Sequence, residues 1–406
     1  MRYCAFVLTL VVVSFLLVFG WRRNNGGTMT QPQQVVTVLR PVPSILNEDT
    51  LPSVDATETK ITKTGVPFEF VHAQFVSENN GWVMSSHSLY RTTDGGKTWE
   101  RLAQEPEKDA RFVSFSFVDE SHGWLAILKQ DFADHYGVGN SSVIMVTDNG
   151  GGSWTLQASY PDEIEIRDIR FLNENEGFAV GAKGLENRAD RCELFVIGTS
   201  NGGKEWNNIS KEANGALKSQ WGVPSECGDY IDWTSSSLLM LTEGGRVMVT
   251  MDKGKTWETV VRLKDERPSG FVSSTGFSKL ALDPKNRIRV VGGASGDEGY
   301  WGDFVINEDG RWTSYEINLT PILDAVFLTD RDVIASGLNL RPSNDKPNRG
   351  LKNAGIILRS FDGGKSWQTI YRSKSFETFF YITKVKDNDF YAVSDTGTFL
   401  RFTLPQ

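Results

Sequence analysis

The chain has 406 residues, of which 39% are hydrophobic and 23% are charged, and its formal net charge is −8. A basic excess is the electrostatic signature of nucleic-acid binding, so this balance argues against nucleic acid as a partner. The 39 glycines and 12 tryptophans are typical of a β-protein with many tight turns.

An uncharged apolar run occupies residues 4–21, with Arg2 before it and Arg22 and Arg23 after it. Its length and flanks predict either a signal anchor or a cleaved signal peptide within residues 1–23. We expect residues 24–57 to be a polar linker and residues 58–406 to form one domain. That domain is expected outside the cytoplasm. It is either anchored in the membrane through residues 4–21, or secreted or periplasmic after cleavage.

After residue 65 a strand pattern recurs along the chain. Each unit has a strand that ends in phenylalanine, a polar turn, and a second strand that opens with glycine and an aromatic residue. The first three units show it best, at Phe75 and Gly81-Trp82, Phe117 and Gly123-Trp124, and Phe171 and Gly177-Phe178. A third strand follows in each unit.

The third strand leads into a motif, [ST]-x-[DN]-x-G-x-[STE]-W, that recurs at intervals of 51 to 55 residues. The acidic or amide residue accepts backbone hydrogen bonds in a tight turn, and the glycine adopts positive φ. The motif therefore predicts a structural hairpin turn, closed by the tryptophan that opens a fourth strand. Its residues are Asp94 and Trp99, Asn149 and Trp154, Asn201 and Trp206, Asp252 and Trp257, Asp362 and Trp367, and, in a degenerate copy, Asn307 and Trp312.

Four antiparallel strands in each repeat of this length predict an all-β fold. We expect a seven-bladed β-propeller of four-stranded antiparallel blades, preceded by an N-terminal hydrophobic segment. The C-terminal stretch has room for only three strands. We expect residues 58–65 to supply the missing strand and close the ring.

The motifs at Asp94, Asp252 and Asp362 resemble the Asp-box, or bacterial neuraminidase repeat, of sialidases and sortilin-type receptors. The longer unit, F-V-x-[ED]-x-x-G-W followed by L-Y-R-T-T-D-G-G-K-T-W, resembles the photosystem II assembly and stability factor type of propeller over residues 65–403. This resemblance implies a non-catalytic scaffold that binds a protein partner, such as a membrane-protein complex.

The alternatives are a sialidase-like exo-glycosidase and a carbohydrate-binding propeller. The sialidase family uses three arginines, a tyrosine paired with a glutamate, and an F/Y-R-I-P motif. The nearest match here, residues 39–43, has the wrong order and lies before the first repeat. Residues 297–303 hold a tyrosine among carboxylates, which also suits a polar surface loop. We therefore expect no catalytic residues.

Function is expected in the long connections, residues 129–142, 183–193, 211–229, 294–303 and 339–353, all of which emerge on the face opposite the Asp-boxes. Loops on a rigid scaffold concentrate binding residues, and aromatic and arginine side chains dominate interfaces. The predicted partner-binding residues are Tyr136, Arg188, Arg191, Trp221, Tyr300, Trp301 and Arg341.

The remaining reactive side chains indicate neither cofactor nor metal. Cys192 and Cys227 form either a disulfide, in an oxidising compartment, or two separate buried thiols. The histidines, His72, His87, His122 and His135, lack zinc-type spacing. We expect them to be satisfied or solvent-exposed imidazoles.

Overall fold

The computed structural model describes residues 36–39, 42–43, 45–47, 54–61, 70–103, 110–129, 141–161, 164–185, 188–221, 228–233, 238–242, 246–265, 277–285, 287–296, 299–308, 311–318, 320–342, 351–374 and 377–405. The apolar run 4–21, Tyr136 and Cys227 lie outside these residues. Within the described ranges, no helix has the length and apolar character needed to span a membrane.

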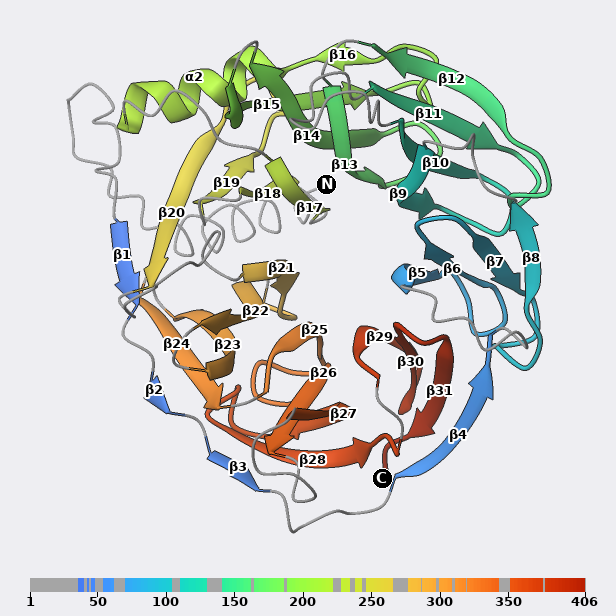
Figure 1. The fold of residues 1–406 in the computed structure, drawn as a ribbon. Coiled ribbons are helices and arrows are strands. Elements are labelled where there is room, and N and C mark those ends of the chain that lie inside the picture. Colours follow the sequence, from blue (N-terminus) through green and yellow to red (C-terminus); the bar gives the residue numbers. More distant parts are fainter. Residues whose placement is uncertain are drawn as a thin grey trace, which may run out of the picture.

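The described strands form seven sheets that stand around a common centre (Figure 1). The first strand of each sheet lies innermost. In chain order the sheets contain β5 (Phe70–Phe75), β6 (Gly81–Ser85), β7 (Leu89–Thr92) and β8 (Glu100–Ala103); β9 (Ala110–Phe117), β10 (Gly123–Lys129), β11 (Ser141–Thr147) and β12 (Thr155–Tyr160); β13 (Ile164–Phe171), β14 (Gly177–Leu185), β15 (Arg188–Thr199) and β16 (Asn207–Asn208); β17 (Gly228–Trp233), β18 (Leu238–Thr242), β19 (Arg246–Thr250) and β20 (Glu258–Asp265); β21 (Phe277–Leu282), β22 (Ile288–Gly296), β23 (Gly299–Glu308) and β24 (Arg311–Asn318); β25 (Ile322–Phe327), β26 (Val333–Pro342), β27 (Leu351–Ser360) and β28 (Ser366–Arg372); and β29 (Phe379–Lys386), β30 (Asp389–Ser394) and β31 (Thr398–Thr403). We number these sheets 1 to 7.

The prediction of a seven-bladed propeller with four-stranded antiparallel blades is wrong as stated. Sheets 4, 5 and 6 have five strands each, and their outermost strands are β1 (Val36–Leu39), β2 (Val42–Pro43) and β3 (Ile45–Asn47). These added strands pair in parallel with β20, β24 and β28. Six sheets contain four strands that are consecutive in the chain, whereas sheet 7 contains three. The strand β4 (Asp55–Lys60) completes sheet 7 by antiparallel pairing with β31.

The N-terminal boundaries are corrected with the fold. Residues 36–57 were expected in a polar linker, but they contribute β1, β2, β3 and the start of β4. The closing strand was expected at residues 58–65 and overlaps β4 only at 58–60. An outer strand leaves backbone N–H and C=O groups unpaired, and an added strand satisfies them. The repeat pattern does not encode this pairing because the partner strands lie far away in the sequence.

The N-terminal segment crosses the outside of the ring from one face to the other. β1 pairs with the end of β20, from Val36 opposite Arg262 onward, whereas β3 pairs with the beginning of β28, where Ile45 lies opposite Ser366. In sheets 1 to 6 the fourth strand follows the Asp-box turn or its degenerate copy. The segment therefore starts at the face opposite these turns and reaches the Asp-box face at β3.

Adjacent sheets are joined by the glycine–aromatic pairs. The rings of Trp82 and Phe117 stack at 3.7 Å between centroids, and those of Trp124 and Phe171 stack at 3.4 Å. Trp82 Nε1 also donates to the Gly150 carbonyl of the next sheet at 3.0 Å. These stacked pairs bury large aromatic surfaces between the sheets.

Two faces of the ring differ in their connections. The Asp-box turns pack on the turns between first and second strands, as when Gly95 N donates to Asn79 O at 3.0 Å. We call this side the box face and the opposite side the loop face. On the loop face, the expected loops at 183–193, 294–303 and 339–353 are largely continuations of the hairpins β14–β15, β22–β23 and β26–β27.

The connection between sheets 3 and 4 contains the helix α2 (Ser210–Trp221), where a loop was expected. Ala213 of this helix is fully buried in the core cluster of sheets 3 and 4. Asn214 Nδ2 donates to the Leu194 carbonyl of β15 at 2.9 Å. The helix is thus held against the propeller by a buried apolar side chain and by the hydrogen bonds that Ser210 and Asn214 make with β15.

Candidate functional site

The Asp-box turns share one hydrogen-bond pattern. In the sixth sheet, Asp362 Oδ1 accepts from Ser366 N at 2.8 Å and from Ser360 Oγ at 2.9 Å, and Asp362 Oδ2 accepts from Ser366 Oγ at 2.6 Å. Asn149 accepts the corresponding amide and hydroxyl bonds in sheet 2. The side-chain acceptors are used within the turn, so these residues act as hairpin closures.

Hydrogen bonding sets the charge state of the acidic box residues. Burial works to raise the pKa of Asp362, but the bonds from Ser366 and Ser360 outweigh burial and lower this pKa below its usual 3.8. The same balance lowers the pKa values of Asp94 and Asp252. All three are therefore carboxylates at neutral pH.

The degenerate copy in sheet 5 is held by a different group. Arg289, which is 1% exposed, donates from Nη1 to the Asn307 carbonyl at 3.0 Å and from Nη2 to Asp283 Oδ2 at 2.7 Å. Asp283 also accepts from Arg287 Nε at 2.7 Å. A buried arginine thus fastens this hairpin to the neighbouring turn, where sheets 1 to 4 and 6 use an Asp-box.

The innermost strands share a feature that the sequence repeat did not reveal. Each carries a β-bulge near its start, and the residue after the bulge occupies an equivalent place in all seven described strands. Bulges commonly redirect a side chain near a functional site. These equivalent residues are His72, Ser114, Asp168, Tyr230, Lys279, Asp324 and Tyr381.

Two of these residues are buried carboxylates that bridge adjacent sheets. Asp168 accepts from Ser114 Oγ at 2.6 Å and from Ile231 N of the next sheet at 3.2 Å. Asp324 accepts from Ile382 N of the next sheet at 3.1 Å and from Lys279 Nζ at 2.5 Å. Buried charges require such partners, because desolvation otherwise costs several kcal/mol.

A cavity of about 530 Å³ lies among the innermost strands of sheets 1 and 3 to 7. Charges of both signs and aromatic rings line it. The charged and aromatic lining residues are His72, Arg170, Asp232, Lys279, Asp324, Phe327, Phe380 and Tyr381. A cavity with a few convergent polar groups at the centre of a rigid fold is the strongest candidate for a binding site in the described part of the chain.

Electrostatics in the cavity keep His72 neutral. Burial, followed by the charges of Arg170 and Lys279, holds the pKa of His72 well below its usual 6.5. Arg170 Nη1 lies 3.1 Å from His72 Nε2, and because an arginine only donates, this nitrogen accepts. Burial likewise raises the pKa of Tyr381 to about 12, so its hydroxyl stays protonated. The cavity therefore offers a neutral imidazole, a phenol and two cationic side chains, besides the acidic side chains of Asp232 and Asp324.

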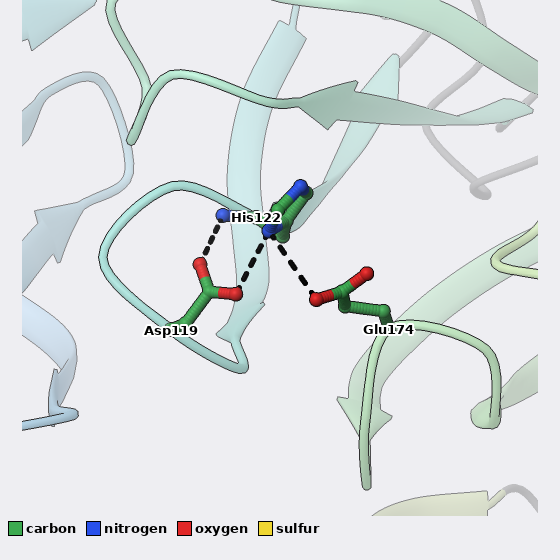
Figure 2. Close-up of side chains that lie close together, drawn as sticks. All are labelled: Asp119, His122 and Glu174. Atoms are coloured by element: carbon green, nitrogen blue, oxygen red, sulfur yellow. Dashed lines mark hydrogen bonds and ion pairs between the residues drawn. The ribbon is translucent and has the colours of Figure 1, made fainter.

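A second group of titratable side chains lies on the box face. Figure 2 shows Asp119 and Glu174 directed at His122 from two adjacent turns. His122 Nδ1 is 2.8 Å from Asp119 Oδ2 and 3.8 Å from Glu174 Oε1. The hydrogen bond to Asp119, opposed by burial and supported by both carboxylates, raises the pKa of His122. Among the described residues, this group has ligand atoms close enough to hold a metal ion.

Its local contacts explain this group without an ion. Asp119 Oδ1 accepts from the amides of Ser121 and His122 at 2.7 Å each, as Asn173 does in the equivalent turn of sheet 3. The contact from His122 to Glu174 has a counterpart between sheets 1 and 2, where Asn80 Nδ2 donates to Glu120 at 2.7 Å. The group is a turn cap joined to a contact between sheets.

Six of the seven predicted partner-binding residues lie in described elements of the loop face. Arg188 and Arg191 lie in β15, Tyr300 and Trp301 in β23, Arg341 in β26, and Trp221 at the end of α2. All six belong to the elements that rise on the loop face, and their role in binding stays a prediction. Cys192 lies in β15, but Cys227 is outside the described residues, so their pairing stays a prediction.

Sequence reasoning missed the cavity residues, although a signal was present. His72, Asp168 and Asp324 each stand three residues before the phenylalanine that ends the innermost strand. A charged or polar residue at one fixed place in successive repeats predicts a ring of side chains around the centre. The alternation of apolar and polar residues in each strand predicts only a half-buried strand, and it does not show that these polar residues meet at the centre.

The cavity lining also bears on the sialidase alternative. Among its described lining residues, Arg170 is the one arginine and no glutamate accompanies Tyr381. A sialidase-like site requires three arginines and a tyrosine–glutamate pair. The described lining residues do not complete this constellation.

The ring of sheets with box turns defines the class of this protein as an Asp-box β-propeller. The BNR/Asp-box repeat family matches residues 90–101. The chain is 24% identical over 313 residues to the photosystem II assembly lipoprotein Ycf48 of Synechococcus sp. (strain CC9902), covering 68% of this chain and 80% of that protein. It is 23% identical over 326 residues to the photosystem II stability/assembly factor HCF136 of Arabidopsis thaliana, covering 78% of this chain and 70% of that protein.

A solved structure described as YCF48 bound to D1 peptide has the same fold. It matches with a TM-score of 0.57 at 17% identity and covers 88% of this chain and 100% of that chain. The resemblance to Asp-box propellers of the photosystem II assembly-factor type is thus confirmed.

Proposed function

We propose that this protein is a non-catalytic assembly scaffold that binds a segment of a membrane-protein subunit. The similarity to proteins named as photosystem II assembly factors, which extends over most of the chain, carries this proposal. The similar structure that contains a D1 peptide supports a polypeptide as the ligand. Polypeptide binding suits a rigid ring whose described cavity holds polar and aromatic groups but lacks the sialidase constellation.

The loop face is the proposed contact surface. Three extended hairpins and α2 rise there, and the innermost strands that line the cavity begin at the same face. Arg188, Arg191, Trp221 and the Tyr300-Trp301 pair are proposed contacts, together with Arg341 and Tyr136. Arginine and large aromatic side chains supply most of the binding energy in protein interfaces.

The proposed location is outside the cytoplasm, tethered by residues 4–21 or released after cleavage. β1 starts toward the loop face of the ring. The stretch between residues 21 and 36 spans at most about 50 Å when extended. A tether of this length would keep the loop face close to the membrane, where segments of membrane-protein subunits are accessible.

A pull-down from native membranes tests the proposal. The tagged full-length protein is compared with a Trp221→Ala/Tyr300→Ala/Trp301→Ala variant, and with a box-face control, Met251→Ala/Phe361→Ala, whose side chains are 56% and 53% exposed. We expect the wild type and the control to retain a defined membrane-protein partner and the loop-face variant to lose it. If only the box-face control lost the partner, the contact surface would lie on the box face instead.

Absence of any partner, together with glycoside cleavage by the purified protein, would replace the scaffold with the exo-glycosidase alternative. If the protein shows neither a partner nor glycoside cleavage, the carbohydrate-binding alternative remains, and binding to immobilised glycans tests it. Each variant is first checked for an unchanged melting temperature, so that loss of binding is not loss of folding.

A further inference from the structure

We propose that the outer edge of β12 is a docking edge, to which an extended segment of the protein partner adds as a parallel strand. This inference rests on the proposed function and specifies a second contact and its mode of binding. Strand addition to an exposed edge is a recurrent way to bind peptides, because the main chain supplies affinity and side-chain pockets supply specificity.

The chain itself provides the precedent. Its N-terminal segment adds β1, β2 and β3 in parallel to the fourth strands of three successive sheets. In sheet 6 the added strand donates a hydrogen bond from Ile45 N to the Lys365 carbonyl at 3.3 Å. The outer edge of the fourth strand can therefore pair with a parallel strand, as it does in three of the sheets.

Among the described strands, β8, β12 and β16 end their sheets without an outer neighbour. β16 has two residues and β8 has four, whereas β12 has six. β8 also contains Glu100 and Arg101, and charged residues are the usual protection of an exposed edge. β12, with the sequence TLQASY, has no charge and no proline. It is the longest and least protected of the three edges.

The side chains at this edge match those that β3 covers in sheet 6. There the box tryptophan Trp367 lies opposite Leu46 of β3 and is fully buried. In sheet 2 the equivalent tryptophan, Trp154, is only partly buried. Leu156 beside it is 58% exposed. Both apolar groups remain open to a strand that would bring a residue like Leu46.

The bulge in β12 is no obstacle to pairing. The register of β11 and β12 shifts between Ile144 and Met145, and the register of β27 and β28 shifts at the equivalent place, between Ile357 and Leu358. β3 nevertheless pairs with β28. The expected occupant is thus an extended peptide with one large aliphatic residue opposite Trp154 and a backbone N–H directed at the Gly152 carbonyl.

Hydrogen exchange with two probes tests the edge. The first is a set of overlapping synthetic peptides that span the D1 protein, and the second is a peptide of this chain's residues 41–49. The β28 edge is occupied by the tethered β3 at high effective concentration, so a free copy of that segment should seek an uncovered edge. We expect either peptide to slow exchange at residues 155–160.

Two variants locate the contact. Leu156→Lys should weaken peptide binding roughly tenfold, as loss of a hot-spot contact does. Met251→Lys, at a residue with nearly the same exposure, 56% against 58%, should leave binding unchanged. A photoreactive benzoylphenylalanine in place of Leu156 should crosslink the peptide, and the same group in place of Met251 should not. Both side chains are exposed, so the fold should tolerate all these changes.

The outcomes separate this inference from the proposed function. D1 peptides that bind without slowing exchange at residues 155–160 would overturn the docking edge and leave the scaffold in place. If D1 peptides fail to bind while the 41–49 peptide protects these residues, the edge stands and the D1-like partner falls. Failure of both peptides to protect them overturns the edge.

Discussion

Substitution of Asp362 tests whether the box turns stabilise the fold. Asp362→Ala removes the acceptor of three hydrogen bonds, from Ser366 N, Ser366 Oγ and Ser360 Oγ. At about 1 kcal/mol for each bond, the loss reaches about 3 kcal/mol. Because Asp362 and Ser366 are only partly buried, water can form part of the lost hydrogen bonds in the Ala variant. We expect a decrease of about 2 kcal/mol in the free energy of unfolding.

Asp362→Asn is the matched control. Asn149 shows that an amide makes the same turn, with its oxygen accepting from Ser153 N and Thr147 Oγ1 and its Nδ2 donating to Ser153 Oγ at 2.8 Å. The Asn variant should therefore lose less than about 1 kcal/mol at neutral pH. Urea unfolding followed by tryptophan fluorescence measures both variants. Equal destabilisation by Ala and Asn would refute the argument, because charge rather than acceptor geometry would then matter.

The pH dependence follows from the lowered pKa of Asp362. Hydrogen bonds outweigh burial and hold the folded pKa below the usual 3.8. The stability that depends on the carboxylate is therefore complete above about 4, and it is lost as the pH falls through the folded pKa. The Asn variant should lack this part of the acid destabilisation. An identical acid limb in both proteins would contradict the assignment.

Three further predictions concern packing and charge. Gly123→Ala would place a Cβ 2.4 Å from the Phe117 ring and should lower the free energy of unfolding by about 1–3 kcal/mol. Gly215→Ala, whose Cβ would have nothing within 4 Å, should leave this free energy unchanged or raise it by up to about 1 kcal/mol. Melting temperatures distinguish the two variants, and equal effects would contradict the contact with Phe117. Asp324→Ala removes a buried anion and should cost about 3 kcal/mol by chemical denaturation, so a neutral effect would count against the bridge between sheets. His72, with its lowered pKa, makes stability fall as the pH drops below 6.5, and its ring resonances in NMR should stay those of neutral imidazole at pH 6.5; a midpoint at or above 6.5 would refute burial as the cause.

The repeat and its turns were accessible from the sequence because their determinants are local. Each box places its acceptor, its glycine and its tryptophan within a few residues, and the spacing of the Gly-Trp pairs follows from the length of one hairpin. Gly81, for example, is required because a Cβ would lie 2.3 Å from Phe75, six residues before it. Contacts of such short separation leave a readable pattern.

The N-terminal strands were not accessible in the same way. Nothing in the sequence near Ile45 and Leu46 shows that they pair with β28, which lies near the other end of the chain. Edge pairing depends on which outer strand lies within reach once the ring has closed. Residues 24–57 were predicted to be a linker because they are polar, but polar residues also suit a strand on the outside of a sheet.

The cavity separates the two kinds of information most clearly. The sequence by itself determined the box turns, the aromatic pairs and the repeat length, since each depends on residues close together in the chain. Only the tertiary structure decided which polar residues meet at the centre. His72, Arg170, Lys279 and Tyr381 come from four sheets and line one cavity. His72, Lys279 and Tyr381 directly follow the bulges of their innermost strands. The physical reason is that a ring brings equivalent positions of distant repeats together, and the local pattern of each strand carries no record of its neighbours across the centre.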